Sequence, residues 1–225
     1  MALTPRPDRP IDPITLSIIR AVVDASTHLG LDAFMVGATA RIILLENVFG
    51  LHAGRATRDI DFAFAVENWE QFQAIKRYLI THKEYEEDTQ AVHRLRYQLP
   101  GGDSQYLIDL IPFGGVECEE NTITWPPDMS VVMNVAGFRD AQATAVKVEV
   151  EPGLALSIAS VSGIAVLKIF AWVDRRHKNP KDAMDMRVLL QQYHQAGNQE
   201  RLYDDAMHAL EALEFDVERA GAWLL

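Results

Sequence analysis

A glycine turn followed by two alternating acids constrains this chain more than any other feature of its sequence. Gly37 directly follows the apolar stretch 31–36, which has the pattern of a short strand. Asp59 and Asp61 begin a second strand-like stretch, in which residues two positions apart point to the same face. Paired ionised carboxylates repel each other unless a cation lies between them, and hard oxygen ligands suit Mg²⁺. The pattern therefore predicts a metal site at these two aspartates.

The turn at Gly37 has the features of an anion site. Residues 40–49 have a helical apolar pattern that ends at Gly50, so Gly37 lies where a strand passes into a helix. Free backbone N–H groups and the positive end of the helix dipole favour phosphate at such a turn. Thr39 and Arg41 add side-chain donors, which predicts that a nucleoside triphosphate bridges the turn and the metal.

This arrangement resembles the nucleotidyltransferase superfamily, whose signature is an apolar residue, Gly, then Gly or Ser, and an Asp-x-Asp pair on the strand after a helix. Ala38 stands at the second small position, where it lacks a hydroxyl and restricts positive φ. The superfamily also expects a third carboxylate on a later strand, and Asp109 within the apolar stretch 106–113 fits this role. The alternative is an aspartate that caps the following loop, but an unpaired charge in an apolar strand is costly.

A closer resemblance, to the AbiEii-type nucleotidyltransferase toxins of bacterial toxin–antitoxin systems, comes from residues 165–176 and 181–186. They form a helix with one embedded lysine, Lys168, followed by Lys-Asp-x-x-Asp, which contains Asp182 and Asp185. The matched motifs extend over residues 36–190. The resemblance implies an NTP substrate, an RNA acceptor such as the 3′ end of tRNA, and a cognate antitoxin.

Each of these three residues also has an ordinary structural interpretation. Lys168 interrupts an otherwise apolar helix, so it must either extend its amine to solvent or find an anion, and the resemblance implies a nucleotide phosphate. Asp182 and Asp185 share a helical face and either favour the helix N-terminus or contact Lys168 or the nucleotide. Lys168→Ala and Asp185→Ala are predicted to abolish transfer and to leave the fold intact.

The remaining pattern predicts an α/β (α+β) fold, with a mixed sheet flanked by helices and a C-terminal helical subdomain. Residues 1–10 are rich in proline and are expected to be extended or disordered, and residues 11–158 form the core. Residues 159–225 are expected to form helices that close the cleft. The strand-like stretches 94–99 and 105–111 are joined by the turn-forming residues 100–104, so they predict a hairpin that carries Asp109.

Composition limits the classes of function. The single cysteine, Cys118, excludes an internal disulfide and a thiolate zinc site, which suits the cytoplasm. No apolar run approaches the ~20 residues that span a bilayer, so we expect no membrane partner. A net charge of −11 argues against indiscriminate nucleic-acid binding, although one basic cluster can still guide RNA: Arg175, Arg176, Lys178 and Lys181. His52, His82 and His93 lack ligand spacing and are interpreted as surface or loop residues.

The leading hypothesis is therefore an NTP-dependent, pyrophosphate-releasing nucleotidyltransferase. Asp59, Asp61 and Asp109 hold Mg²⁺ or Mn²⁺, and Asp109 accepts the proton of the acceptor hydroxyl. The nucleotide site comprises Gly37, Ala38, Thr39, Arg41, Lys168, Asp182 and Asp185. Two alternatives stay open: a glycosyltransferase that uses Asp-x-Asp to hold Mn²⁺ on a sugar nucleotide, and a non-catalytic nucleotide-binding module of the same fold.

Overall fold

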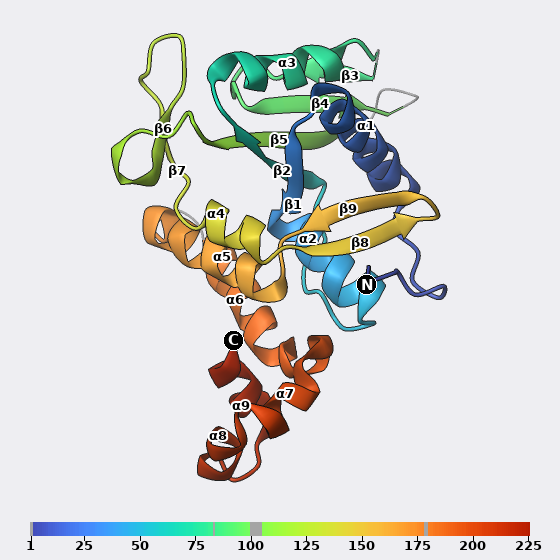
Figure 1. Cartoon of the computed structure of the whole chain (residues 1–225), viewed down its shortest axis with the longest axis vertical. Coiled ribbons are helices and arrows are strands. Elements are labelled where there is room, and N and C mark those ends of the chain that lie inside the picture. Colours follow the sequence, from blue (N-terminus) through green and yellow to red (C-terminus); the bar gives the residue numbers. More distant parts are fainter. Residues whose placement is uncertain (1, 83, 100–104, 178–179) are drawn as a thin grey trace.

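The computed structural model describes residues 2–82, 84–99, 105–177 and 180–225 (Figure 1). Within them, seven strands form one mixed sheet in the order β3-β4-β5-β2-β1-β9-β8. The strands are β1 (Asp32–Val36), β2 (Asp59–Val66), β3 (Tyr85–Glu87), β4 (Arg94–Gln98), β5 (Gln105–Gly114), β8 (Val146–Glu151) and β9 (Leu154–Ile158). A separate short pair comprises β6 (Thr122–Thr124) and β7 (Val132–Asn134). The predicted mixed sheet flanked by helices is confirmed.

The centre of the sheet combines both strand directions. β2 runs antiparallel to β1 and parallel to β5, and β4 runs antiparallel to β5. On the other side, β9 is parallel to β1 and antiparallel to β8. The predicted pairing of β4 with β5 is therefore present, whereas the connecting residues 100–104 lie outside the described part of the chain.

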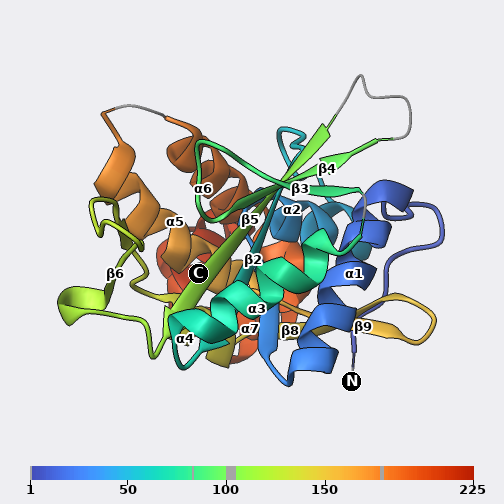
Figure 2. The ribbon, with the colours of Figure 1, turned by 90° about the horizontal axis from the view of Figure 1, so that it is seen from above.

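Two helices cover one face of the sheet. The first, α1 (Pro13–Leu29), begins at Asp12, whose carboxylate accepts a hydrogen bond from the backbone N–H of Thr15 at 2.8 Å. It ends at Gly30, whose φ of 65° suits glycine. Its neighbour α3 (Trp69–Ile80) packs alongside it (Figure 2). Because strand side chains alternate, Phe62 and Phe64 of β2 lie buried on one face, while Asp59 and Asp61 lie on the other.

The face that carries the aspartates meets helices from both halves of the chain. The first is α2 (Gly37–Ile42), which continues into the π-helical turn η1 (Ile43–Val48). Next are α4 (Phe138–Ala143) and α5 (Val161–Arg175), and α5 contacts both α2 and α4. Ser160 caps α5, and its hydroxyl accepts a hydrogen bond from the N–H of Gly163 at 3.0 Å.

The C-terminal helices continue from α6 (Lys181–Gln192), which packs on α5. The turn η3 (His194–Asn198) then leads to α7 (Gln199–Asp204), α8 (Met207–Ala212) and α9 (Val217–Leu224). These last three helices have a small apolar cluster of their own, formed by Leu202, Leu210 and Ala220. Figure 1 shows them as a lobe at the far end from β3 and β4. The part of this C-terminal region that packs near the sheet is α5 and α6.

The beginning of the chain is tied to the edge of the sheet. Leu3 forms a parallel bridge with Val148 of β8, and its N–H donates to the carbonyl of Lys147 at 2.8 Å. The side-chain amide of Asn47 also donates to the carbonyls of Arg9 and Pro10. These contacts anchor the proline-rich stretch along the core. In the described part of the chain, no helix combines the length and apolar character needed to cross a membrane.

Candidate active site

The predicted acids of the second and third motifs lie on neighbouring strands. The parallel register of β2 and β5 places Asp61 directly opposite Asp109. Asp59 lies two residues before Asp61 on the same strand and therefore on the same face. The adjacency that the sequence suggested is thus present, and it brings Asp61 and Asp109 side by side at the centre of the sheet.

Asp61 has an unfavourable environment for a carboxylate. It is partly buried, and none of the described residues donates a hydrogen bond to its side chain. Burial and the negative charge of Asp109 raise its pKa from 3.8 to about 7, with Lys168 acting in the opposite direction. A carboxylate in this position is stabilised by an added cation.

Asp109 already has a cationic partner. Arg94 of β4 donates from Nε to Oδ1 at 2.7 Å and from Nη2 to Oδ2 at 2.8 Å, a two-pronged ion pair. The Nε2 atom of His93 lies 3.9 Å from the same carboxylate, and its ring packs against Trp125. His93 lies in the turn before β4, as predicted, but this turn is next to the candidate site.

The glycine turn lies directly against Asp61. Gly37 has a φ of 74°, and a Cβ atom at this position would lie only 2.0 Å from Oδ2 of Asp61. Only glycine allows both the positive φ and this close approach. Because Gly37 is the residue of this turn with positive φ, Ala38 carries no such strain. Thr39 is buried, and its hydroxyl donates to the backbone carbonyl of Asp59 at 2.8 Å.

Lys168 is held by two acids of α6. Its Nζ atom donates to Asp182 at 2.9 Å and to Asp185 at 2.7 Å, and all three side chains are buried. Arg175, two turns further along α5, donates to both oxygens of Asp182 at 2.6 and 2.9 Å. Although burial opposes it, these hydrogen bonds lower the pKa of Asp182. An ammonium has three N–H donors, so one remains on Lys168 for another anion.

Two further arginines meet Asp185 from the opposite side. The Nη2 atom of Arg41 lies 3.3 Å from Oδ1, and that of Arg55 lies 3.4 Å from Oδ2. Arg41 is fully buried and also donates to the carbonyls of Ala53 and Arg55. Its guanidinium group therefore faces the protein interior instead of an open phosphate position.

The site is electrically divided. On the helical side, four cations share two carboxylates: Arg41, Arg55, Lys168 and Arg175 with Asp182 and Asp185. On the strand side, Asp59, Asp61 and Asp109 have one such cation within ion-pair distance in the described structure, Arg94. Lys168 and Arg175 act electrostatically on Asp61, so the two sides are close. The arrangement suits a ligand that is positive at one end and negative at the other, such as a metal-bound nucleotide.

Two carboxylates are the candidate ligands for a metal ion. Among the described residues, no group of three or more His, Cys, Asp or Glu side chains has the geometry to hold a metal ion. Mg²⁺ commonly binds through one or two carboxylates together with substrate phosphates and water. Asp59 and Asp61 fit that mode, because both lack the ion pair that Asp109 makes.

Three arginines complete the site: Arg55, Arg94 and Arg175. The sequence indicated Arg175 as part of a basic cluster that can guide RNA, but it paired none of the three with a particular acid. Arg175 is seven residues after Lys168, so helical periodicity places both on one face and offered a usable signal. The role of Arg94 could be recognised only from the register of β4 against β5, which places it opposite Asp109. Arg55 lies in the loop before β2, where no periodic pattern indicates direction.

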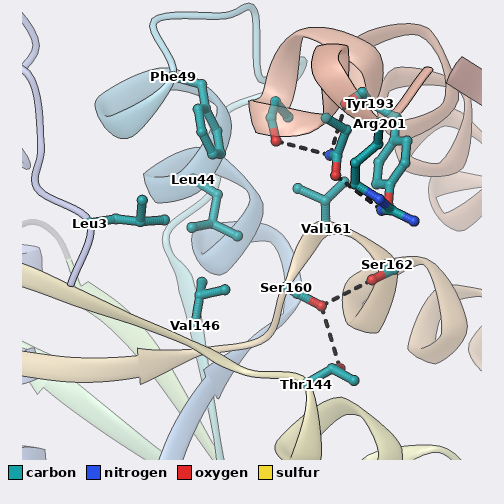
Figure 3. A pocket seen from close by; sticks show the side chains of 12 residues that line it. Leu3, Leu44, Phe49, Thr144, Val146, Ser160, Val161, Ser162, Tyr193 and Arg201 are labelled. Carbon is teal, nitrogen blue, oxygen red and sulfur yellow. Dashed lines mark hydrogen bonds between the residues drawn. The ribbon is translucent and has the colours of Figure 1, made fainter. Parts of the chain in front are cut away.

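A cavity of about 230 Å³ lies elsewhere, between the core and the C-terminal helices. Figure 3 shows Leu44 and Phe49 on one side of it and Tyr193 and Arg201 on the other. None of the acids or the cations described above lines this cavity. The candidate site is thus separate from it.

Comparison with known proteins agrees with this geometry. The family model for "Nucleotidyl transferase AbiEii toxin, Type IV TA system" matches residues 22–218, which is most of the chain. A search among curated proteins found no match.

The chain is similar to solved structures at low sequence identity. An antigenic nucleotidyltransferase-like protein from Paracoccidioides brasiliensis is 16% identical, with a TM-score of 0.51 and coverage of 94% of this chain and 95% of that one. The antibiotic-resistance factor ANT(2'')-Ia is 15% identical, with a TM-score of 0.47 and coverage of 91% and 98%. Because the family model covers both the glycine turn and the lysine helix, the chain belongs to the AbiEii family and is a nucleotidyltransferase.

Proposed function

We propose that the chain transfers a nucleoside monophosphate from an NTP to an acceptor hydroxyl, with a divalent metal ion held at Asp59 and Asp61. The observation that carries this proposal is the charge division of the site. Asp59 and Asp61 of β2 have no ion pair among the described residues, and close to them four cations share only two carboxylates. A bound Mg²⁺ or Mn²⁺ ion supplies charge neutralisation for the phosphates. The family match favours this reaction over the glycosyltransferase alternative.

The residues of the chain then have distinct tasks. The turn at Gly37 and the remaining donor of Lys168 bind the triphosphate, and Arg175 adds positive charge at the more open end of α5. The acceptor oxygen forms a bond to the α-phosphorus, the bond to the departing pyrophosphate breaks, and Asp109 takes the acceptor proton. Thr39, Arg41, Asp182 and Asp185 hold the surrounding elements in place.

RNA is the acceptor that we propose. The support is the pair of exposed basic side chains Arg175 and Arg176 at the C-terminal end of α5, where Arg175 binds Asp182 of the site. Local positive charge of this kind binds the phosphates of a nucleic acid even when the whole protein is acidic. We further propose that the chain acts as the toxin of a toxin–antitoxin pair, as its family description suggests.

The test is a transfer assay with each of the four α-labelled NTPs, Mg²⁺ and total RNA. Label should enter RNA with at least one NTP, and EDTA should prevent it. Asp61→Asn is the matched negative control, because it removes charge and changes the size of the side chain little. Absence of label in RNA, protein and small molecules with every NTP would overturn the proposed function.

The toxin role has a separate test. Induced expression of the wild-type chain should arrest growth of a bacterial host, and expression of Asp61→Asn should not. Equal growth of both strains at equal protein levels would refute the toxin role without affecting the transfer reaction.

A further inference from the structure

Three charged residues form a row across the centre of the sheet. Asp109 lies opposite Asp61 in the parallel pair β2–β5 and opposite Arg94 in the antiparallel pair β4–β5. The strands β4, β5 and β2 lie next to one another in Figure 1. The middle residue of the row therefore has a like charge on one side and an opposite charge on the other.

The contact between Arg94 and Asp109 fixes the relative orientation of the two side chains. Both carboxylate oxygens receive a guanidinium N–H, at 2.7 and 2.8 Å, and only a planar fork makes two such bonds at once. An ionised carboxylate has about four lone-pair positions, so each oxygen keeps one for a further partner. Arg94 thus fixes the plane of the Asp109 carboxylate and leaves a lone pair on each oxygen for another partner.

The charge of Arg94 also affects the metal site. Without it, Asp59, Asp61 and Asp109 would present three uncompensated negative charges on adjacent strands. Such a cluster attracts a divalent cation more strongly, because the Coulomb energy grows with the charge nearby. With Arg94 in place, only Asp59 and Asp61 remain without a cation at ion-pair distance among the described residues.

We propose that Arg94 is a positioning residue with two effects. It orients Asp109 toward the acceptor, and it limits the affinity for divalent metal of the acid row, by which we mean Asp59, Asp61 and Asp109. This inference rests on the proposed nucleotidyl transfer and assigns a task to a residue outside the family motifs that the sequence showed. Arg94 acts through Asp109 and does not itself contact the reacting atoms.

Arg96 provides a matched control on the same strand. It lies two residues after Arg94 on the same face and is similarly exposed, 31% against 29%. It also donates from Nε to an aspartate, Asp88, at 2.7 Å. Arg94→Ala and Arg96→Ala therefore each remove a guanidinium group of β4 that is paired with an aspartate. Only Arg94→Ala removes the partner of Asp109.

The experiment makes two measurements. Electron paramagnetic resonance of the free ion measures the binding of Mn²⁺ without nucleotide, and a single-turnover assay measures the rate of nucleotidyl transfer. Arg94→Ala should bind Mn²⁺ about tenfold more tightly than wild type, and its transfer rate should fall about 100-fold because Asp109 loses its orientation. Arg94→Lys should restore the wild-type Mn²⁺ affinity, since it keeps the charge, but not the rate, since it lacks the fork. Arg96→Ala should match wild type in both measurements.

Several outcomes would overturn the inference. Equal behaviour of Arg94→Ala and Arg96→Ala would show that Arg94 has no particular role. Loss of both Mn²⁺ binding and transfer in Arg94→Ala and Arg94→Lys would indicate a merely structural role. A wild-type protein that binds Mn²⁺ but transfers no nucleotide would refute the proposed function alone, because the binding measurements still test Arg94. A wild-type protein that binds no Mn²⁺ on its own would overturn the inference but not the proposed function, because the metal can still bind together with the phosphates of the NTP.

Discussion

Gly37 and Asp61 are so close that no side chain fits between them. The Cβ atom of any other residue at position 37 would lie 2.0 Å from the carboxylate oxygen Oδ2, well inside van der Waals contact. The glycine turn and β2 can therefore approach this closely only because Gly37 has no Cβ atom. This relationship connects the first two sequence motifs in space.

Gly37→Ala should abolish most of the transfer activity. The new methyl group must displace the Asp61 carboxylate, and a displacement of about 1 Å at a catalytic group costs on the order of 100-fold in rate. The positive φ of 74° adds backbone strain of about 1 to 2 kcal/mol. Single-turnover transfer and urea denaturation measure the two effects.

Gly30→Ala separates strain from displacement. Gly30 also has a positive φ, 65°, but a Cβ atom there would meet nothing within 4 Å. This variant should lose a similar amount of stability and keep wild-type activity. If both variants lost activity equally, the contact between Gly37 and Asp61 would not be the cause.

The stability of the metal-free protein should depend on the protonation of Asp61. Burial and the charge of Asp109 raise its pKa to about 7, above the 3.8 of an unperturbed aspartate. The folded state therefore binds the proton more tightly than the unfolded state, so its advantage is complete below about pH 4 and is lost as pH rises through about 7. In EDTA, the free energy of unfolding should fall by up to about 4 kcal/mol over this range.

Asp61→Asn provides the comparison, because the amide cannot ionise. Urea denaturation at pH 5 and pH 8, followed by tryptophan fluorescence, should show a smaller decrease in this variant than in the wild type. Adding Mg²⁺ at pH 8 should stabilise the wild type more than the variant. An identical pH dependence in both proteins would contradict the raised pKa.

Replacement of Lys168 should destabilise the fold. The sequence alone predicted that Lys168→Ala would leave the fold intact, but the structure shows Asp182 and Asp185 buried against this amine. Removing one partner leaves buried negative charge less well compensated, which costs about 3 kcal/mol. Lys168→Met, which retains bulk, isolates this charge effect, and urea denaturation measures it. Lys147→Ala, at an exposed position, should stay within about 0.5 kcal/mol of the wild type.

RNA binding should weaken when basic residues near the site are removed. Arg176→Ala should lower the affinity for a short RNA with a free 3′ hydroxyl and reduce the slope of log affinity against log salt by about one unit. Fluorescence anisotropy over a range of KCl concentrations gives this slope. Arg77→Ala, on α3 at the other face of the sheet, is the matched control and should leave the slope unchanged. Equal slopes for all three proteins would argue against an RNA acceptor at this surface.

The elements of the core were predictable because their local signals agree. The strand-like stretch that begins at Asp59 is β2, and the stretches predicted to form a hairpin are β4 and β5. The acids of the site were also predictable, since charge inside an apolar strand needs a partner. Asp109 has such a partner, the cation Arg94, which the sequence did not pair with it.

The contacts between elements were not predictable in the same way. The pairing of Arg94 with Asp109 depends on the register of β4 against β5, and a shift of one residue would turn every side chain of β4 to the other face. Arg41 is on a short helix whose polar residues gave no sign that it would be fully buried. Its burial depends on Asp185, which is 144 positions away in the sequence.

The hydrogen bond from Thr39 to the backbone of Asp59 has a mechanical consequence. It fastens the helix after the glycine bend to the first residue of β2, so the glycine turn and Asp59 are held together. The buried contacts of Asp185 with Arg41 and with Lys168 extend this connection to α6 and α5. A change in any one of these four elements is therefore passed directly to the other walls of the site.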